Sequence, residues 1–114
     1  MSENSLQILQ KCIPIFEALK DQERQNIIVK LCEQGELTVN EIAEQSSLSR
    51  PAISHHLKIL REQGLIKVHQ KGTQRFYSIS LQDAIHLLKE LTDHLEQDVQ
   101  NSPCTNTDNL DGGC

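Results

Sequence analysis

Hydrophobic residues recur at helical spacing in five stretches of the chain and at strand spacing in two short ones. The first stretch, residues 5–19, carries two adjacent apolar stripes that together cover about half of the helix circumference. One stripe contains Ile8, Cys12, Ile15 and Leu19, and the other contains Leu6, Leu9, Ile13 and Phe16. Such a wide apolar arc exceeds what a small core covers, so we expect this helix to pack on its own core and on a second subunit.

Capping residues mark the second helix. Asp21 is placed to cap a helix over residues 22–33, and Gly35 ends it. The inward residues of this helix are expected to be Ile27, Ile28, Leu31 and Cys32. Cys32 is therefore predicted to be a small buried hydrophobic residue rather than a reactive thiol.

The next two helices are short and closely spaced. Thr38–Glu41 is a capping-box sequence that opens the third helix, and Ser49 caps the fourth, with Pro51 in its first turn. The small residue Ala43 lies where these two helices must cross, and Ile53 follows ten residues later to pack against it. This spacing predicts a helix-turn-helix.

The pattern then becomes extended. Residues 65–69 and 74–79 are predicted strands of a hairpin whose tip, residues 70–73, is basic and contains glycine. Ser80 then begins a last helix over residues 81–99. Its apolar face consists of Ile85, Leu88, Leu91, Leu95 and Val99.

Length and composition indicate one small domain. The chain has 114 residues, of which we expect 1–100 to fold and 101–114, rich in polar residues and glycine, to form a disordered tail. No apolar run approaches the roughly 20 residues needed to cross a bilayer, and the N-terminus lacks the features of a signal peptide. We therefore expect a cytoplasmic protein without a membrane partner, whose cysteines are thiols rather than structural disulfides.

Positive charge is concentrated in one part of an acidic chain. The whole chain has a net charge of −5, yet between Arg50 and Arg75 six basic residues accompany only Glu62, giving +5. The remainder, with five basic and fifteen acidic residues, carries −10. A basic stripe on an acidic body is typical of a protein that binds nucleic acid.

The predicted fourth helix carries much of this charge on one face. About 100° of rotation per residue brings together Arg50, Ser54, His55, Lys58 and Arg61. These side chains can contact phosphates and base edges in a major groove. A solvated charged helix is the plainer interpretation, and the local reversal of charge argues against it. His56 lies on the apolar arc, and we expect a packed histidine there rather than a DNA contact.

The segments SRPAISHHLKILREQGLI and KGTQRFYSI, in this order of elements, resemble the recognition helix and wing of the ArsR/SmtB family of bacterial winged-helix repressors. The resemblance covers about residues 8–99. It implies a mainly α fold with a β-hairpin wing, in the order α-α-α-α-β-β-α. It also implies a homodimer joined through the first and last helices, which binds an inverted-repeat operator in double-stranded DNA and is released by a chemical signal.

The resemblance also implies which residues contact DNA. The groove-facing residues would be Ser49, Arg50, Ser54, His55 and Lys58, and the phosphate contacts of the wing would be Lys71 and Arg75. Arg61 completes the basic face of the helix. Residues 1–100 would then be one winged helix-turn-helix domain for DNA binding and dimerisation.

Two metal sites known in the family can be checked against this chain. The first needs two cysteines at the start of the third helix, where Thr38 and Asn40 stand, so the thiolates required by soft metals are missing. The second lies on the last helix, where Leu81 and Gln97 replace two of its ligands. A cluster on one face of that helix nevertheless includes Asp83, His86, Glu90 and His94. We favour a solvated face with His–Glu pairs there and keep a divalent-metal site as the alternative.

Thiol chemistry is the remaining source of a signal. Cys104 lies in the polar tail, where it should be exposed, and Cys12 and Cys114 are its candidate partners in a dimer. Three converging thiolates would suit As(III) or Sb(III), and an exposed thiol would suit a redox signal. We take this thiol signal as the first hypothesis for the inducer.

Other classes of function fit less well. The chain has no nucleophile elbow, no phosphate-binding glycine loop and no apparent pair of catalytic carboxylates, so we do not expect an enzyme. A winged helix can also serve as a protein-interaction module without binding DNA. Such a module has no need of a charge of +5 on the recognition helix and wing, which favours the DNA-binding hypothesis.

Overall fold

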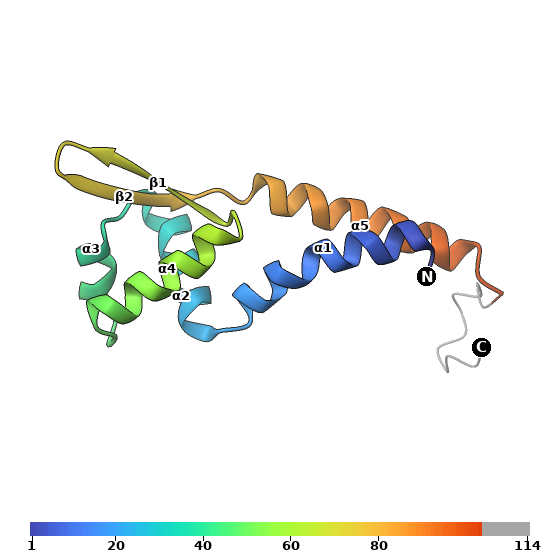
Figure 1. Ribbon diagram of the computed structural model, residues 1–114, viewed down its shortest axis with the longest axis horizontal. Coiled ribbons are helices and arrows are strands. Elements are labelled where there is room, and N and C mark those ends of the chain that lie inside the picture. Colours follow the sequence, from blue (N-terminus) through green and yellow to red (C-terminus); the bar gives the residue numbers. More distant parts are fainter. Residues whose placement is uncertain (104–114) are drawn as a thin grey trace.

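The computed structural model describes residues 1–103, and within them the elements follow the expected α-α-α-α-β-β-α order (Figure 1). The elements are α1 (Glu3–Leu19), α2 (Gln22–Gln34), α3 (Val39–Glu44), α4 (Arg50–Glu62), β1 (Ile66–Lys71), β2 (Gln74–Ile79) and α5 (Gln82–Gln100). The fold is thus mainly helical with a hairpin wing. No helix in residues 1–103 is long and apolar enough to cross a membrane.

The molecule has a head and an arm, and measures 59 × 25 × 21 Å. Helices α2, α3 and α4 form the head with the hairpin, while α1 and α5 lie side by side and antiparallel in the arm (Figure 1). At the tip of the arm the backbone N–H of Ser2 donates to the carboxylate of Asp98, at 2.9 Å. The arm therefore brings the first and last turns of the described chain together, far from the head.

The core of the head is built from apolar side chains of every element around it, nearly all of them aliphatic. Helix α4 contributes Ile53, Leu57 and Leu60, all at most 1% exposed, and α1 enters the same core through Ile15 and Ala18. The other buried members are Ile27, Leu31, Leu37, Ile42, Leu65, Ile66, Tyr77 and Ala84. Because α4 is packed along its whole apolar face, its opposite face is held in one orientation.

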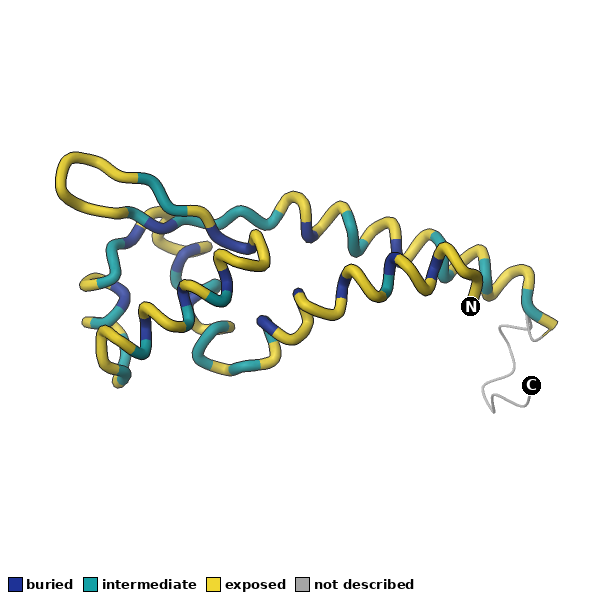
Figure 2. Tube along the Cα trace, viewed as in Figure 1, coloured by how far each residue is buried: buried dark blue, intermediate teal, exposed yellow. Residues whose placement is uncertain are grey.

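The arm has a smaller core of its own. Ile8, Cys12 and Leu91 are buried there, with Leu9, Leu87, Leu88 and Leu95 packed around them. This uses the first apolar stripe of α1. The second stripe stays largely uncovered, since Leu6, Ile13 and Phe16 are 46%, 44% and 40% exposed. Figure 2 shows buried positions of α1 interrupted by exposed turns along the arm.

The predicted caps of the two helix-turn-helix helices are confirmed. Thr38 Oγ1 accepts from the N–H of Glu41, while the Glu41 carboxylate accepts from the N–H of Thr38, which completes the capping box. Ser49 Oγ accepts from the N–H of Ala52 at the start of α4. In the turn between these helices, Ser46 Oγ accepts from the N–H of Leu48.

The hairpin is longer than the sequence indicated. Strand β1 continues to Lys71, which pairs with Gln74, so that only Gly72 and Thr73 form the turn, with Gly72 at a φ of 62°. A positive φ at this position is readily adopted by glycine. On its other edge β2 pairs with Leu37, whose N–H and C=O both bond Tyr77. The wing is thereby anchored to the segment before α3.

Two sequence predictions about individual residues were wrong. Cys32 is exposed, because in α2 the buried positions are Ile27 and Leu31 and Cys32 lies one residue beyond the covered face. Since α5 starts at Gln82, Ser80 does not begin the last helix. Its N–H bonds the carbonyl of Leu65 and holds it in the extended exit from the wing, so Leu81 takes the N-cap position without a side-chain hydrogen bond.

Candidate nucleic-acid interface

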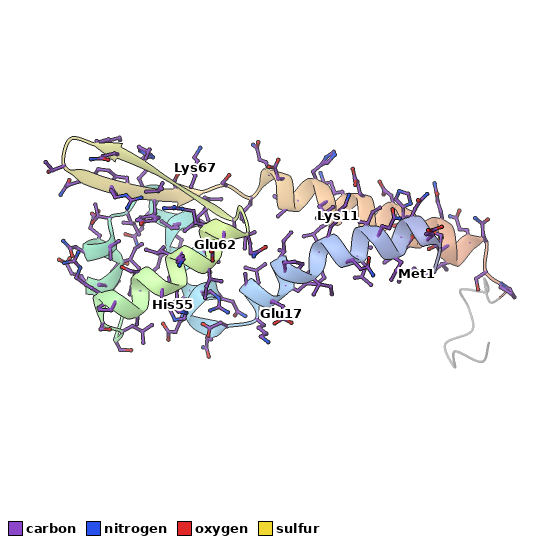
Figure 3. All side chains as sticks on the ribbon, viewed as in Figure 1. Met1, Lys11, Glu17, His55, Glu62 and Lys67 are labelled. Atoms are coloured by element: carbon purple, nitrogen blue, oxygen red, sulfur yellow. The ribbon has the colours of Figure 1, made fainter. Side chains whose placement is uncertain are left out.

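Helix α4 presents its polar face away from the core of the head. The predicted contact residues Ser49, Arg50, Ser54, His55, Lys58 and Arg61 are all exposed. Figure 3 places His55 and Glu62 on this helix, with Lys67 on the neighbouring strand. The structure thus gathers the residues predicted from the sequence on one accessible face, opposite Ile53, Leu57 and Leu60. Their contacts with DNA remain a prediction.

Most basic residues between positions 50 and 75 are free to bind an external anion. Within residues 1–103, five of these six side chains form no hydrogen bond or ion pair, the exception being Lys71. The five are Arg50, Lys58, Arg61, Lys67 and Arg75. Elsewhere Lys20 pairs with Glu17, and Lys30 donates to the carbonyl of Gln45. Lys11 and Lys89 on the arm are also unpaired in the described chain, so α4 and the wing differ from the rest in gathering five such side chains.

Lys71 is held within the wing by an acidic residue. Its ammonium lies 2.9 Å from Oε2 of Glu36, and Oε1 of the same carboxylate lies 3.0 Å from Nε2 of His69. Phe76 lies beneath both, with its ring centre 5.2 Å from the ammonium and 6.1 Å from that of His69. The hydrogen bond from Lys71, with the neighbouring charges, lowers the pKa of Glu36 below its ordinary value. The Glu36 carboxylate thus neutralises a predicted phosphate contact.

An open cleft lies between the wing tip and the two helices of the helix-turn-helix. Its volume is about 250 Å³, and none of its described lining residues is acidic. The polar residues that line it are Thr38, Asn40, Arg50, Thr73, Gln74 and Arg75. Two guanidinium groups with hydroxyl and amide donors are suited to a backbone phosphate.

Sequence reasoning missed Asn40, Thr73 and Gln74 as members of this surface. Arg50 and Arg75 were identified from their charge, whereas these neutral residues come from separate segments that only the fold brings together. The one local signal was that Thr73 and Gln74 directly precede Arg75 at the wing tip. Thr38 was identified as a helix cap, and both Thr38 and Asn40 as replacements for cysteines of a metal site, but neither was assigned to this surface.

His56 is half-buried, in accord with the expectation of a packed histidine. Its Nδ1 lies 3.2 Å from Nη1 of Arg24, a residue of α2. The guanidinium can only donate, so Nδ1 of His56 is the acceptor and the ring proton lies on Nε2. His56 therefore faces α2 and not the exposed face of α4.

The cluster on α5 is not assembled as a metal site within one chain. No group of three or more potential ligand side chains in residues 1–103 is arranged to hold a metal ion. Nε2 of His86 lies 3.4 Å from Oε1 of Glu90, which is the i,i+4 pair of a solvated helix face. Asp83 and His94 take no part in that pair. A site formed with a second subunit would need ligands from both chains.

The two cysteines in the described part of the chain have different surroundings. Cys12 is fully buried in the core of the arm, and burial raises the pKa of its thiol. Cys104 and Cys114 lie outside the described residues. Cys32, which the sequence placed in the core, is the exposed thiol in residues 1–103. Cys12 can reach an external ligand only if α1 and α5 separate locally.

Comparisons with known proteins agree with this arrangement. Residues 21–68 match the family described as "Bacterial regulatory protein, arsR family". The chain is 34% identical over 90 residues to the arsenical resistance operon repressor of Bacillus subtilis, covering 79% of this chain and 86% of that protein. It is 36% identical over 93 residues to the transcriptional repressor SmtB homolog of Synechocystis, covering 82% and 70%.

A solved structure supports the fold independently. Reduced HlyU from Vibrio cholerae superposes with a TM-score of 0.67 at 26% identity, covering 79% of this chain and 94% of that one. The coverage extends beyond the helix-turn-helix, since residues 21–68 alone would be less than half of the chain. The shared architecture therefore includes more of the chain than residues 21–68.

Proposed function

Because the chain belongs to the arsR family of bacterial regulatory proteins, we propose that it acts as a homodimeric repressor on an inverted-repeat operator and is released by a chemical signal. Family membership makes it a DNA-binding transcriptional regulator and not an enzyme. The dimer, the form of the operator and the signal are the proposed parts. Acting on DNA, it would work in the cytoplasm.

The proposed DNA-binding surface is supported mainly by the unpaired basic side chains on α4 and the wing. Arg50 and Arg75 line the cleft together, and Lys58 and Arg61 continue the basic surface along α4. With α4 in a major groove, the cleft would hold a backbone phosphate beside it. Ser54 and His55 would then read base edges.

The uncovered apolar stripe of α1 supports the homodimer. Leu6, Ile13 and Phe16 are exposed on the arm, and α5 adds Ile85 and Val99 at 47% and 54% exposure. Exposed apolar residues that align along two packed helices indicate a missing partner. A second copy related by a twofold axis would cover the exposed apolar residues of both α1 and α5. This symmetry matches an inverted repeat in the DNA.

Two measurements test this function. Sedimentation gives the oligomeric state, and titration of duplex DNA at two salt concentrations shows whether phosphates are neutralised. A DNA fragment containing the promoter of the protein's own gene should bind more tightly than a random duplex, with protection of two half-sites. Affinity that is independent of both salt and sequence would instead favour the protein-interaction module.

For the signal, we favour a thiophilic metalloid or an oxidant that reacts with Cys104, together with Cys12 and Cys114. The resemblance to an arsenical resistance operon repressor supports As(III) as the ligand to test first, with Sb(III) beside it. The burial of Cys12 means that its participation requires the arm to open. The alternative is a divalent metal held by Asp83, His86, Glu90 and His94 across the dimer, which the resemblance to an SmtB homolog supports.

A further inference from the structure

Arg24 connects three helices through a single guanidinium group. Its Nε donates to the carbonyl of Ala18 at 2.6 Å and its Nη2 to that of Glu17 at 3.4 Å, both in the last turn of α1. Its Nη1 donates to Nδ1 of His56 on α4 at 3.2 Å. Arg24 itself belongs to the first turn of α2, where its N–H donates to Asp21. The side chain therefore lies where the arm meets the head.

The end of α1 depends on α2 for its capping. The last carbonyls of a helix lack partners within the helix, and α1 has no basic residue in its own last turn. Arg24 supplies both hydrogen bonds and positive charge to them, and Gln25 donates to the carbonyl of Leu19 at 2.8 Å. These two side chains fix the direction in which α1 leaves the head.

His56 extends this connection to the recognition helix. It lies directly after His55 on the exposed face and before Leu57 in the core. The contact with Arg24 crosses from the start of α2 to the middle of α4. Of the two residues that cap the end of α1, Arg24 also bonds α4, whereas Gln25 has no such contact in the described chain.

We propose that Arg24 and His56 are positioning residues that fix the angle between the dimer arm and α4, and thereby set the half-site spacing that the dimer accepts. This rests on the proposed dimeric, DNA-binding function. The backbone passes between arm and head at two places, near Lys20–Asp21 and Ser80–Leu81. Ile15, Ala18 and Ala84 also pack into the head core, and the hydrogen bonds of Arg24 add a directional contact at the first of these junctions. A change in angle at the first junction alters the separation of the two α4 helices, although no residue that touches DNA has changed.

The test is the spacing preference of the full-length protein. Half-sites are first selected from a pool of random duplexes, and binding is then measured with the spacer lengthened or shortened by one and two base pairs. Wild type should bind one spacing best. Arg24→Leu and His56→Leu should weaken this discrimination by roughly tenfold, since each removes a hydrogen bond to a charged group. The selected half-site sequence should stay the same.

Two control variants separate positioning from general destabilisation. Gln25→Leu removes a cap of α1 without touching α4, and His56→Asn keeps an acceptor near the place of Nδ1. Both should retain the spacing preference of wild type. If His56→Leu keeps the sharp preference, or if Gln25→Leu loses it equally, the proposal is overturned. If wild type selects no paired half-sites, the proposed binding of a dimer to an inverted repeat is itself contradicted.

A second measurement does not depend on the variants folding. Nitrogen NMR of wild type at pH 7.5 reports the tautomer of His56, which must carry its proton on Nε2 to accept from Arg24. We expect this tautomer in free and DNA-bound protein. A proton on Nδ1 in the DNA-bound protein would exclude the hydrogen bond and with it the proposal.

Discussion

The ammonium of Lys71 lies 2.9 Å from the carboxylate of Glu36, a residue 35 positions earlier in the chain. The pair joins β1 of the wing to the segment that precedes α3, next to the backbone bridge between Leu37 and Tyr77. A basic residue near the wing tip is thus paired with a carboxylate of the same chain at the surface, while Arg75 on the neighbouring strand has no such partner in residues 1–103. The two wing residues predicted from sequence are therefore not equivalent.

We expect Arg75→Ala to weaken binding to random duplex DNA more than Lys71→Ala does. Loss of one phosphate contact should reduce the slope of log affinity against log salt by about 0.9. Lys71→Ala should change the slope much less, because Glu36 already compensates its charge. In a Glu36→Gln background the effect of Lys71→Ala should approach that of Arg75→Ala. Equal effects of the two alanine variants in the wild-type background would show that Glu36 does not restrain Lys71.

The contact of Glu36 should also depend on pH. Its pKa is lowered, first by the hydrogen bond from Lys71, so the carboxylate is favoured in the folded protein. The resulting stabilisation of the wing is present above the ordinary value of 4.5 and is lost as the pH falls through the lower folded value. NMR shifts of the Phe76 ring should report this transition in wild type and lack it in Glu36→Gln. The same transition in both proteins would assign it to another group.

Arg50→Ala and His55→Ala should each reduce binding to the selected operator by about 1–3 kcal/mol if they read bases. Arg50 also lines the cleft, so its loss should weaken random duplexes as well. His55→Ala should act mainly on the specific sequence. Fluorescence anisotropy with operator and random duplexes separates the two effects. Unchanged affinity in both variants would remove this face of α4 from the interface.

Local patterns in the sequence predicted most of the fold. The capping box of Thr38 and Glu41, the cap at Ser49 and the apolar faces of α1 and α4 each depend on residues within a few turns of one another. In α2 the apolar periodicity predicted that Cys32 is buried, but the buried face ends at Leu31. Ser80 was expected to begin the last helix, but its N–H bonds the carbonyl of Leu65 at the exit from the wing.

The parts of the site that sequence could not predict are contacts between distant segments. Arg24 and His56 are 32 positions apart, and each is ordinary for its place in a helix. Glu36 and Lys71 were both visible as charges, yet only the bridge between Leu37 and Tyr77 brings them together. The neutral residues of the cleft carried no charge signal at all.

The two apolar stripes of α1 predict different results for mutations in the arm. Phe16 is exposed on the second stripe, so Phe16→Asp should give a folded monomer with weakened operator binding. Leu91 is buried against Ile8 and Cys12 within one chain, so Leu91→Asp should destabilise the arm itself by at least about 3 kcal/mol. Sedimentation and thermal unfolding distinguish the two outcomes. A folded dimer after Phe16→Asp would place the interface elsewhere.

The signal should act through the tail before it reaches the arm. Cys12 is buried and the pKa of its thiol is raised, so it should react with a thiol reagent more slowly than the exposed Cys32. We therefore expect As(III) or a mild oxidant to release wild type from its operator, and Cys104→Ser to lose this response. Cys32→Ser, which changes an exposed thiol of the head, is the matched control and should respond normally.

Release by Zn(II) but not by thiol reagents would assign the sensing role to Asp83, His86, Glu90 and His94. A normal response of Cys104→Ser would exclude Cys104 as the residue that senses the signal.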